Sequence, residues 1–232
     1  MTVKGKSAEA GHWWPHRPAR TGAPKDPVTE ERIVATALEL LAREGAEGVS
    51  VRSISTELGV SRATVYWWIG SRDRLVALVA EELHAKVKLP ATDDSRPWTD
   101  KLRALATSSR KVYARYPGAV ALIQESGIVT GPATLRMVDR YLALFLEAGF
   151  RPRDAIQAFG TMSNAVLVGL EPQPAQEVTW PAGEGLQELS PDAFPGITAT
   201  AHLFDEWNPP DFAFTLDVVI DGLAAKAAGS PH

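Results

Sequence analysis

The sequence predicts an all-α protein that has an N-terminal three-helix head with a helix-turn-helix, followed by a larger helical domain. Three observations lead to this fold class. Apolar residues recur every three or four positions over most of the 232 residues. Ser, Thr, Gly and Pro stand where helices would begin or end. No segment alternates apolar and polar residues as a half-buried strand does, and no internal repeat or glycine-rich phosphate loop is present.

The composition is that of a globular protein. Hydrophobic residues make up 45% of the chain and charged residues 22%, which is enough apolar material for a sizeable core. The chain has no cysteine, so disulfides, thiolate metal sites and cysteine nucleophiles are excluded. No apolar run approaches the roughly 18–20 residues that span a bilayer, and the N-terminus lacks the hydrophobic block of a signal peptide. We therefore expect a soluble, cytoplasmic protein without membrane partners.

Positive charge is concentrated in the first third of the chain. The net charge is −4, yet residues 1–27 carry five Lys or Arg against two acidic residues, and residues 50–74 carry four Arg against two. Residues 1–28 lack apolar periodicity and are rich in Gly, Pro and Ala, so we expect a flexible basic tail. Its tandem Trp13 and Trp14 leave two interpretations open: a loosely docked or disordered tail, or a basic arm that touches DNA.

The head is expected to occupy residues 29–71. Thr29 is a candidate N-cap because acidic residues follow it in the first turn, where the helix dipole favours them. That helix ends at Gly45. Ser50 is expected to cap a short helix over 51–58, and Ser61 to cap a third helix that runs through Trp68.

Residues 72–232 are expected to form an effector-binding and dimerisation domain. A long helix over 72–88 ends before Pro90. The Pro- and Gly-rich stretch over 172–195 is long for a loop in a compact domain. Further helices are predicted over 98–116, 119–125, 133–148, 153–170, 197–204 and 211–227.

Residues 51–69 have the spacing of a helix-turn-helix. Ser55 is small where the two helices would cross closely, and Gly59 stands in the turn, where a positive φ is wanted. The predicted interior of the motif is apolar and consists of Ile54, Leu58, Val60, Val65 and Ile69. Any helical hairpin can mimic this pattern.

The outward face of the second helix of the motif favours DNA binding. Arg62, Thr64, Tyr66 and Trp67 are expected to be exposed once the apolar residues point inward. Arg suits guanine and phosphate oxygens, Thr can contact thymine, and Tyr can reach a phosphate. An exposed Tyr–Trp pair is costly unless something covers it. The alternative for Trp67 and Trp68 is that at least one packs against the first helix.

The segment SVRSISTELGVSRATVYWWIGSRDRLVALV, residues 50–79, resembles the DNA-binding unit of the TetR family of bacterial repressors. Three later segments resemble the regulatory domain of the tetracycline-repressor subgroup: PWTDKLRALATSSRKVYARYPG, LALFLEAGFRPRDAIQAFGTMSNAVLVGLEPQ and FAFTLDVVIDGLAAK. The resemblance covers about residues 28–226.

This resemblance implies a homodimer whose recognition helices enter successive major grooves of a palindromic operator, with repression as the usual outcome. Trp68 replaces the more usual His of the family. The resemblance assigns base reading to Arg52, Arg62, Ala63, Thr64 and Tyr66, phosphate contacts to Thr29, Trp67, Trp68 and Arg72, and Ser61 to the start of the reading helix.

The resemblance also implies a small effector bound between the central helices. The subgroup uses histidine to help coordinate a drug-bound magnesium, but the histidines here are His12, His16, His84, His202 and His232, and none is expected on the central helices. Glu171 aligns with an acidic residue of the subgroup, and one carboxylate does not make a metal site. We therefore expect a largely apolar effector with no metal and no cofactor. The predicted pocket residues are Leu105, Ser109, Gln124, Val138, Tyr141, Phe159 and Asn164.

The dimer is expected to form through the helices over 153–170 and 211–227. The last helix carries apolar residues on one stripe, and Phe214 and Val218 on the opposite side, so both faces need cover. The alternative is that the 172–195 loop covers the second face. Two other functions are alternatives at this point: an architectural DNA-binding protein without an effector, and an enzyme. The enzyme is disfavoured because no Gly-x-Ser-x-Gly and no paired His/Glu spacing is present.

Overall fold

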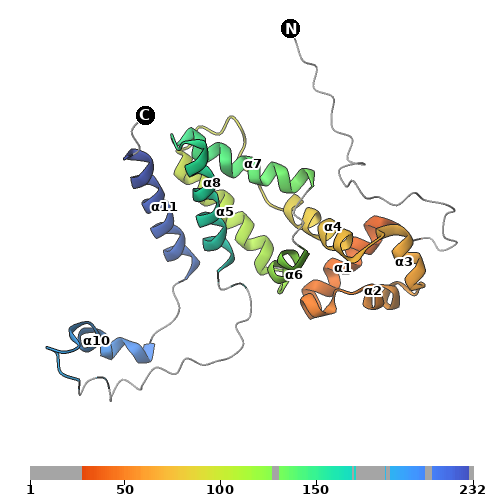
Figure 1. Ribbon diagram of the computed structural model, residues 1–232, viewed down its shortest axis with the longest axis horizontal. Helices are drawn as coiled ribbons and strands as arrows, with labels where there is room; N and C mark the ends of the chain where they lie inside the picture. Colours follow the sequence, from red (N-terminus) through yellow and green to blue (C-terminus); the bar gives the residue numbers. More distant parts are fainter. Residues whose placement is uncertain are drawn as a thin grey trace, which may run out of the picture. The chain divides into compact units, whose positions relative to one another are not determined.

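The computed structural model describes residues 28–126, 131–168, 170, 186, 189–206 and 211–229 (Figure 1). Within these ranges every regular element is a helix, which confirms the predicted all-α fold class. The chain divides into two compact units, residues 1–172 with 216–232 and residues 173–215. The tail with Trp13 and Trp14, Glu171 and most of the 172–195 stretch lie outside the described residues.

The helices of the first unit follow the predicted order and differ by about a turn at most. The predicted 72–88 helix ends at Ala85, and the predicted 153–170 helix ends at Leu167. The elements at the N-terminal end are α1 (Glu30–Glu44), η1 (Ala46–Gly48), α2 (Val51–Leu58), α3 (Arg62–Ile69) and α4 (Arg72–Ala85). The elements behind them are α5 (Trp98–Ala114), α6 (Ala119–Ser126), α7 (Pro132–Glu147), α8 (Pro152–Leu167) and α11 (Phe212–Ala228).

The second unit contains a short helix followed by a 3-10 helix. These are α10 (Pro195–Thr200) and η2 (Ala201–Glu206), where the sequence predicted one short helix over 197–204. None of the helices that the structure describes is both long and apolar enough to cross a membrane.

The first four helices begin at hydroxyl side chains, as the sequence predicts for α1, α2 and α3. Each cap oxygen accepts a hydrogen bond from the backbone N–H three residues later, which satisfies a donor that the helix itself leaves unpaired. The N···O distances are 3.3 Å at Thr29, 3.0 Å at Ser50, 3.0 Å at Ser61 and 3.1 Å at Ser71.

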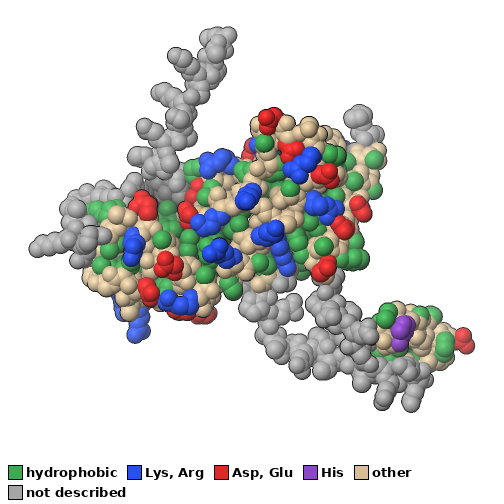
Figure 2. All heavy atoms as spheres, turned by 180° about the vertical axis from the view of Figure 1, so that it is seen from behind, with side chains coloured by type: hydrophobic (Ala, Val, Ile, Leu, Met, Phe, Trp, Pro, Cys, Tyr) green, Lys and Arg blue, Asp and Glu red, His purple; other side chains and the backbone are tan. Residues whose placement is uncertain are grey.

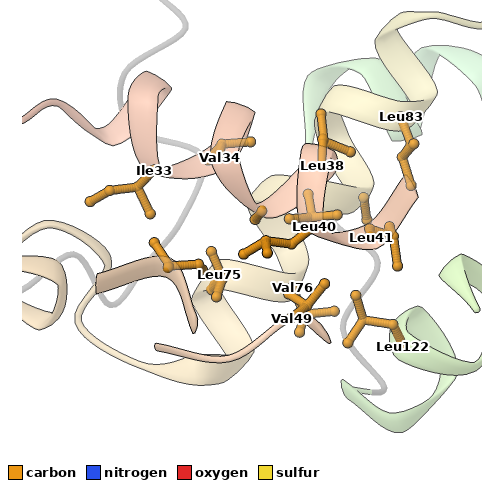
Figure 3. Packing of buried hydrophobic residues seen from close by; sticks show 14 of the residues in the cluster. Ile33, Val34, Leu38, Leu40, Leu41, Val49, Leu75, Val76, Leu83 and Leu122 are labelled. Carbon is orange, nitrogen blue, oxygen red and sulfur yellow. The ribbon is translucent and has the colours of Figure 1, made fainter. Parts of the chain in front are cut away.

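One hydrophobic core runs from the three-helix head into the helices behind it (Figure 3). Ile33 and Leu41 of α1 and Leu75 and Leu83 of α4 have no exposed surface, and Leu122 of α6 packs into the same cluster. Helix α4 packs against α1, α5, α6 and α7. Helix α4, which follows the predicted boundary at residue 71, therefore shares the core of the head.

Basic side chains are unevenly distributed over the surface. Figure 2 shows the face opposite to that of Figure 1, on which Lys and Arg side chains gather over the middle of the helical body.

The buried side chain of Arg74, on α4, contacts both α1 and α3. The Arg74 side chain is 5% exposed, and its Nη2 lies 2.6 Å from Oε2 of Glu30 in the first turn of α1. Its Nη1 donates to the carbonyl oxygens of Trp68 (2.9 Å) and Ile69 (3.3 Å), two of the last carbonyls of α3. Arg74 therefore donates hydrogen bonds to carbonyls at the C-terminal end of α3 that have no partner within the helix, and it also forms an ion pair with α1.

Replacing Arg74 by Met is expected to lower the free energy of unfolding by about 3 kcal/mol, because it removes the donor that a largely buried carboxylate and two helix carbonyls share. Urea denaturation followed by circular dichroism measures the loss. Arg43→Met is the matched control, since Arg43 pairs with Glu57 at 3.2 Å on the surface. Exposed ion pairs contribute little to the free energy of unfolding. Equal stability of the two variants would contradict the role given to Arg74.

Candidate nucleic-acid interface and ligand cavity

Residues 51–69 form the predicted helix-turn-helix. Ile54, Val65 and Ile69 are fully buried between α2 and α3. Gly59 adopts a left-handed conformation (φ 67°, ψ 29°), and the Val60 N–H donates to the carbonyl of Ser55 at 3.0 Å, which closes the turn. The glycine is required here because other residues adopt this conformation at a cost.

The outer side of this motif presents basic and aromatic groups. Tyr66 is 47% exposed, and Arg62 and Ala63 are exposed beside it on α3. Arg52 on α2 and Arg72 in the first turn of α4 are also exposed. Of the remaining predicted DNA-binding residues, Thr29 and Ser61 are exposed N-caps, and Trp67 is half-buried.

The predicted exposure of Thr64 is wrong. Its side chain is buried at 7% exposure, and its Oγ1 lies 3.0 Å from the Oγ of Ser61. The reason is the N-cap: the Thr64 N–H bonds to Ser61, which turns the first turn of α3 so that Thr64 packs inward beside Val65.

The two tryptophans of α3 have different surroundings. Their rings meet edge to face, with centroids 4.8 Å apart and an interplanar angle of 81°. Trp68 packs against the core of the head, so the packing alternative applies to this residue.

A small cavity of about 50 Å³ lies between α5, α7 and α8. At its wall the Ser109 Oγ lies 3.1 Å from the Tyr141 Oη, and the rings of Tyr141 and Phe159 are 5.7 Å apart. The residues that line it are Ser109, Tyr113, Met137, Tyr141, Phe159, Ser163, Val166 and Leu167.

Three of the seven predicted pocket residues, Ser109, Tyr141 and Phe159, line this cavity. Leu105 is buried one turn before Ser109, whose hydroxyl donates to its carbonyl, and Val138 is half-buried on α7.

Gln124 and Asn164 lie outside the cavity with exposed side chains. Gln124 belongs to α6, which packs on α4 and η1. Asn164 follows Ser163 directly, and one residue turns a side chain about 100° around a helix.

The predicted pocket residues do not include five residues that line the cavity: Tyr113, Met137, Ser163, Val166 and Leu167. Their helical spacing from Ser109, Tyr141 and Phe159 was the available signal, because residues three or four apart share one face of a helix.

His84 links the cavity to α4. It does not belong to the central helices, but its side chain contacts two of them, which the sequence did not indicate. His84 is 3% exposed near the end of α4. Its Nε2 lies 2.6 Å from the Oη of Tyr113 on α5, and its Nδ1 lies 2.6 Å from the Oγ1 of Thr134 on α7. Both ring nitrogens are therefore engaged in hydrogen bonds.

Glu81 extends this network to the N-terminus of α7. Its carboxylate accepts the backbone N–H groups of Ala133 (2.5 Å) and Thr134 (3.1 Å) and the hydroxyl of Thr134 (3.2 Å). A carboxylate at this position matches the positive end of the helix dipole. Helix α4 thus holds both α5 and α7 through adjacent polar side chains.

Burial sets the protonation states in this region. Desolvation lowers the pKa of His84 to about 4, although Glu81 raises it in part. Desolvation raises the pKa of Tyr113 to about 12 and that of Tyr141 well above its ordinary value. All three groups are neutral at pH 7. Among the described residues no group of three or more His, Asp or Glu side chains lies together as a metal site would require.

Two family models match the chain. The model described as "Tetracyclin repressor-like, C-terminal domain" matches residues 89–227, and the model for bacterial regulatory proteins of the tetR family matches residues 33–79. The class A tetracycline repressor protein from transposon 1721 of Escherichia coli is 30% identical over 201 residues, which are 84% of this chain and 89% of the repressor.

Two solved structures have a similar fold. ActR of Streptomyces coelicolor in complex with actinorhodin has a TM-score of 0.72 at 24% identity, and the match covers 88% of this chain and 99% of ActR. BioQ with its double-stranded DNA operator has a TM-score of 0.59 at 18% identity over 85% of this chain and 99% of BioQ.

The buried neutral His84 makes stability depend on pH. Its pKa is 6.5 when unfolded and about 4 when folded, so as pH falls through this window the unfolded state takes up a proton that the folded state does not. The free energy of unfolding is therefore expected to fall by about 2 kcal/mol between pH 7 and pH 5 through this group.

Urea unfolding of wild type and of His84→Gln at both pH values measures the contribution of His84. His84→Gln should lose that part of the pH dependence, whereas His202→Gln, at an exposed position, should keep it. The same decrease in wild type and His84→Gln would show that another group is responsible.

Proposed function

The chain belongs to the TetR family of bacterial transcriptional regulators, as its sequence resemblance predicts, and from this premise we propose that it is a repressor. It binds a palindromic operator as a homodimer and releases the operator when a small, largely apolar effector binds. The observation that carries the proposal is the outer face of α3, where Arg62 and Tyr66 are exposed on a helix fixed by buried residues. The relatives are regulators, and we propose no enzymatic activity. A DNA operator also makes the cytoplasm the proposed site of action.

In this proposal α3 is the recognition helix, and residues 29–71 are the DNA-binding domain. Arg62, Ala63 and Tyr66 are available for base edges, because they are exposed on one side of α3. Arg52 and Arg72 flank them on α2 and α4 and carry the charge that phosphates require. Thr64 reaches DNA only if its hydroxyl leaves Ser61, so we rank it below Arg62 and Tyr66.

The effector is proposed to bind in the α5–α7–α8 cavity and to act through α4. Typical ligand pockets measure about 300–1,000 Å³, so a cavity of about 50 Å³ must widen before it holds a drug-sized molecule. Widening moves α5 or α7, which His84 and Glu81 connect to α4. A ligand that prefers the wider conformer therefore shifts the population of α4 positions. The small cavity also suits the alternative of an architectural DNA-binding protein without an effector.

The dimer is proposed to form through α8 and α11. On α11, Leu216, Ile220 and Leu223 are buried, whereas Phe214 and Val218 are 63% and 56% exposed. Ile156 on α8 is 60% exposed. Exposed apolar side chains on two helices need cover, and a second copy of the chain supplies it in a four-helix arrangement. The competing cover, the 172–195 stretch, lies mostly outside the described residues.

Arg62→Ala and Tyr66→Ala are each expected to weaken specific operator binding by about 1–3 kcal/mol without loss of fold, because both side chains are exposed. Fluorescence anisotropy with a duplex selected from a random library measures the affinity. Arg136→Ala is the control, because it removes an exposed arginine from α7. If both α3 variants bind the selected duplex as wild type does, α3 is not the reading helix.

Ser163→Phe is expected to abolish effector response and leave operator binding intact, because it fills the cavity from α8. Asn164→Phe, at the exposed next position, is the matched control and should respond normally. Actinorhodin serves as the first probe, and release of the labelled duplex is the readout. Equal release from both variants would place the effector elsewhere. No release from wild type by actinorhodin or by a panel of neutral polycyclic ligands would favour the architectural alternative.

Val218→Glu is expected to convert a dimer to a monomer, because it places a charge on the exposed apolar side of α11. Sedimentation equilibrium at micromolar concentration gives the mass. Arg136→Glu, at an exposed position of α7 outside the proposed interface, should remain dimeric. A monomeric wild type, or a dimeric Val218→Glu, would contradict this interface.

A further inference from the structure

A second and larger cavity lies on the other side of α5. It measures about 610 Å³ and is bounded by α5, by the segment that follows α4 and by the loop that precedes α5. The two cavities use different faces of the same helix: Ser108, Lys111 and Arg115 line this one, whereas Ser109 and Tyr113 line the small cavity. The larger cavity is therefore separate from the proposed effector site.

Five basic side chains surround this cavity, and no described acidic side chain lines it. They are Lys86, Lys88, Arg96, Lys111 and Arg115. Lys86 pairs with Glu82 at 2.6 Å and Arg96 with Asp94 at 2.7 Å. Within the described part of the chain, Lys88, Lys111 and Arg115 have no carboxylate at ion-pair distance. At least three positive charges at the cavity are thus uncompensated.

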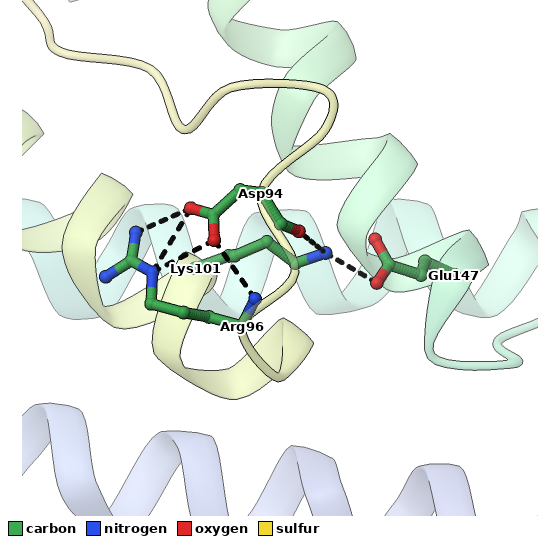
Figure 4. A network of polar contacts seen from close by, with 4 residues as sticks. All are labelled: Asp94, Arg96, Lys101 and Glu147. Carbon is green, nitrogen blue, oxygen red and sulfur yellow. Dashed lines mark hydrogen bonds and ion pairs between the residues drawn. The ribbon is translucent and has the colours of Figure 1, made fainter.

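Arg96, which lines the cavity, is hydrogen-bonded to Asp94, as Figure 4 shows. Its Nε and Nη2 both donate to the carboxylate of Asp94, and its backbone N–H donates to the same group at 3.1 Å. These hydrogen bonds lower the pKa of Asp94 to about 2, so the pair stays charged. Lys101 donates to the Asp94 carbonyl and pairs with Glu147 of α7, which fastens the loop to the helices. A held guanidinium loses less conformational entropy when an anion binds.

The floor of the cavity is apolar. Pro90 and Tyr116 are buried, and Leu89 and Val112 are half-buried beside them. A phosphate or sulfate ion alone would leave this floor in contact with water. A ligand that also has a flat apolar part covers the floor while its anionic groups meet the surrounding cations.

We propose that this cationic cavity is a second ligand site, for a small organic anion that carries two or more negative charges next to an aromatic or apolar group, as a nucleoside diphosphate does. Its volume lies within the range of about 300–1,000 Å³ in which proteins bind such ligands. The charges select multiply charged anions, and the floor selects among them by their apolar part. This inference does not depend on the proposed operator or effector.

Three probes separate the two requirements of the site. ADP has both the anionic and the flat part, inorganic pyrophosphate has only the charges, and adenosine has only the flat part. Isothermal titration calorimetry of the full-length protein at low salt is expected to detect ADP, with pyrophosphate at least tenfold weaker and adenosine undetected. Binding of pyrophosphate as strong as that of ADP would overturn the proposed role of the floor.

Lys88→Gln/Lys111→Gln is expected to weaken ADP binding at least tenfold, since it removes two of the charges around the cavity. Arg136→Gln on α7 removes an exposed positive charge away from the cavity, and this control variant should bind ADP as wild type does. Both lysines are exposed, so unchanged circular dichroism and melting temperature are expected. Unchanged ADP affinity in the double variant would overturn the site.

The competing occupant of a basic surface is the DNA backbone. Each lost phosphate contact lowers the steepness of the salt dependence of DNA binding by about one unit in the slope of log K against log salt. The double variant is expected to keep the wild-type slope for the selected duplex. A slope reduced by about two would assign the cations to DNA and overturn the small-anion proposal.

Discussion

The position of α3, the proposed recognition helix, depends on the buried guanidinium of Arg74. Helix α3 has eight residues, too few to be stable as an isolated helix. Its N-terminus is held by Ser61, its buried side by Val65 and Ile69, and its C-terminal carbonyls by Arg74, which also pairs with Glu30 of α1. Because Arg74 belongs to the first turn of α4, the reading face cannot be positioned independently of α4.

Helix α4 therefore connects the two proposed functions. At its start, Arg74 fixes α3, and near its end Glu81 and His84 hold α7 and α5. The same helix contributes Leu75, Val79 and Leu83 to the core of the head, and a packed core does not deform continuously. In the proposed mechanism, a change in the spacing of α5 and α7 is passed to α3 as a shift of α4. The coupling free energy equals the difference in ligand affinity between the two positions of α4.

Local features of this chain were predictable from sequence, and those that depend on tertiary partners were not. The caps at Thr29, Ser50 and Ser61 and the turn at Gly59 follow from residue chemistry within four positions. Arg74 was counted only in the charge balance of residues 50–74, and its burial depends on Glu30, which is 44 residues away. His84 meets Tyr113 and Thr134, 29 and 50 residues away. The predicted exposure of Thr64 and the predicted pocket position of Asn164 were wrong for a local reason. Adjacent residues of a helix point about 100° apart, and this rotation separates a buried position from an exposed one.

The same rotation explains how α5 can serve two cavities of opposite character. Ser109 and Tyr113 lie on its buried face, where burial keeps Tyr113 neutral, and Ser108, Lys111 and Arg115 lie on the face towards water. An anion pays a large desolvation cost in the small cavity, which offers it no cation. A neutral apolar molecule gains nothing from the cations of the larger one. The periodicity of one helix therefore separates the two proposed ligand classes by charge, and α4 packs against this helix, which lines both cavities.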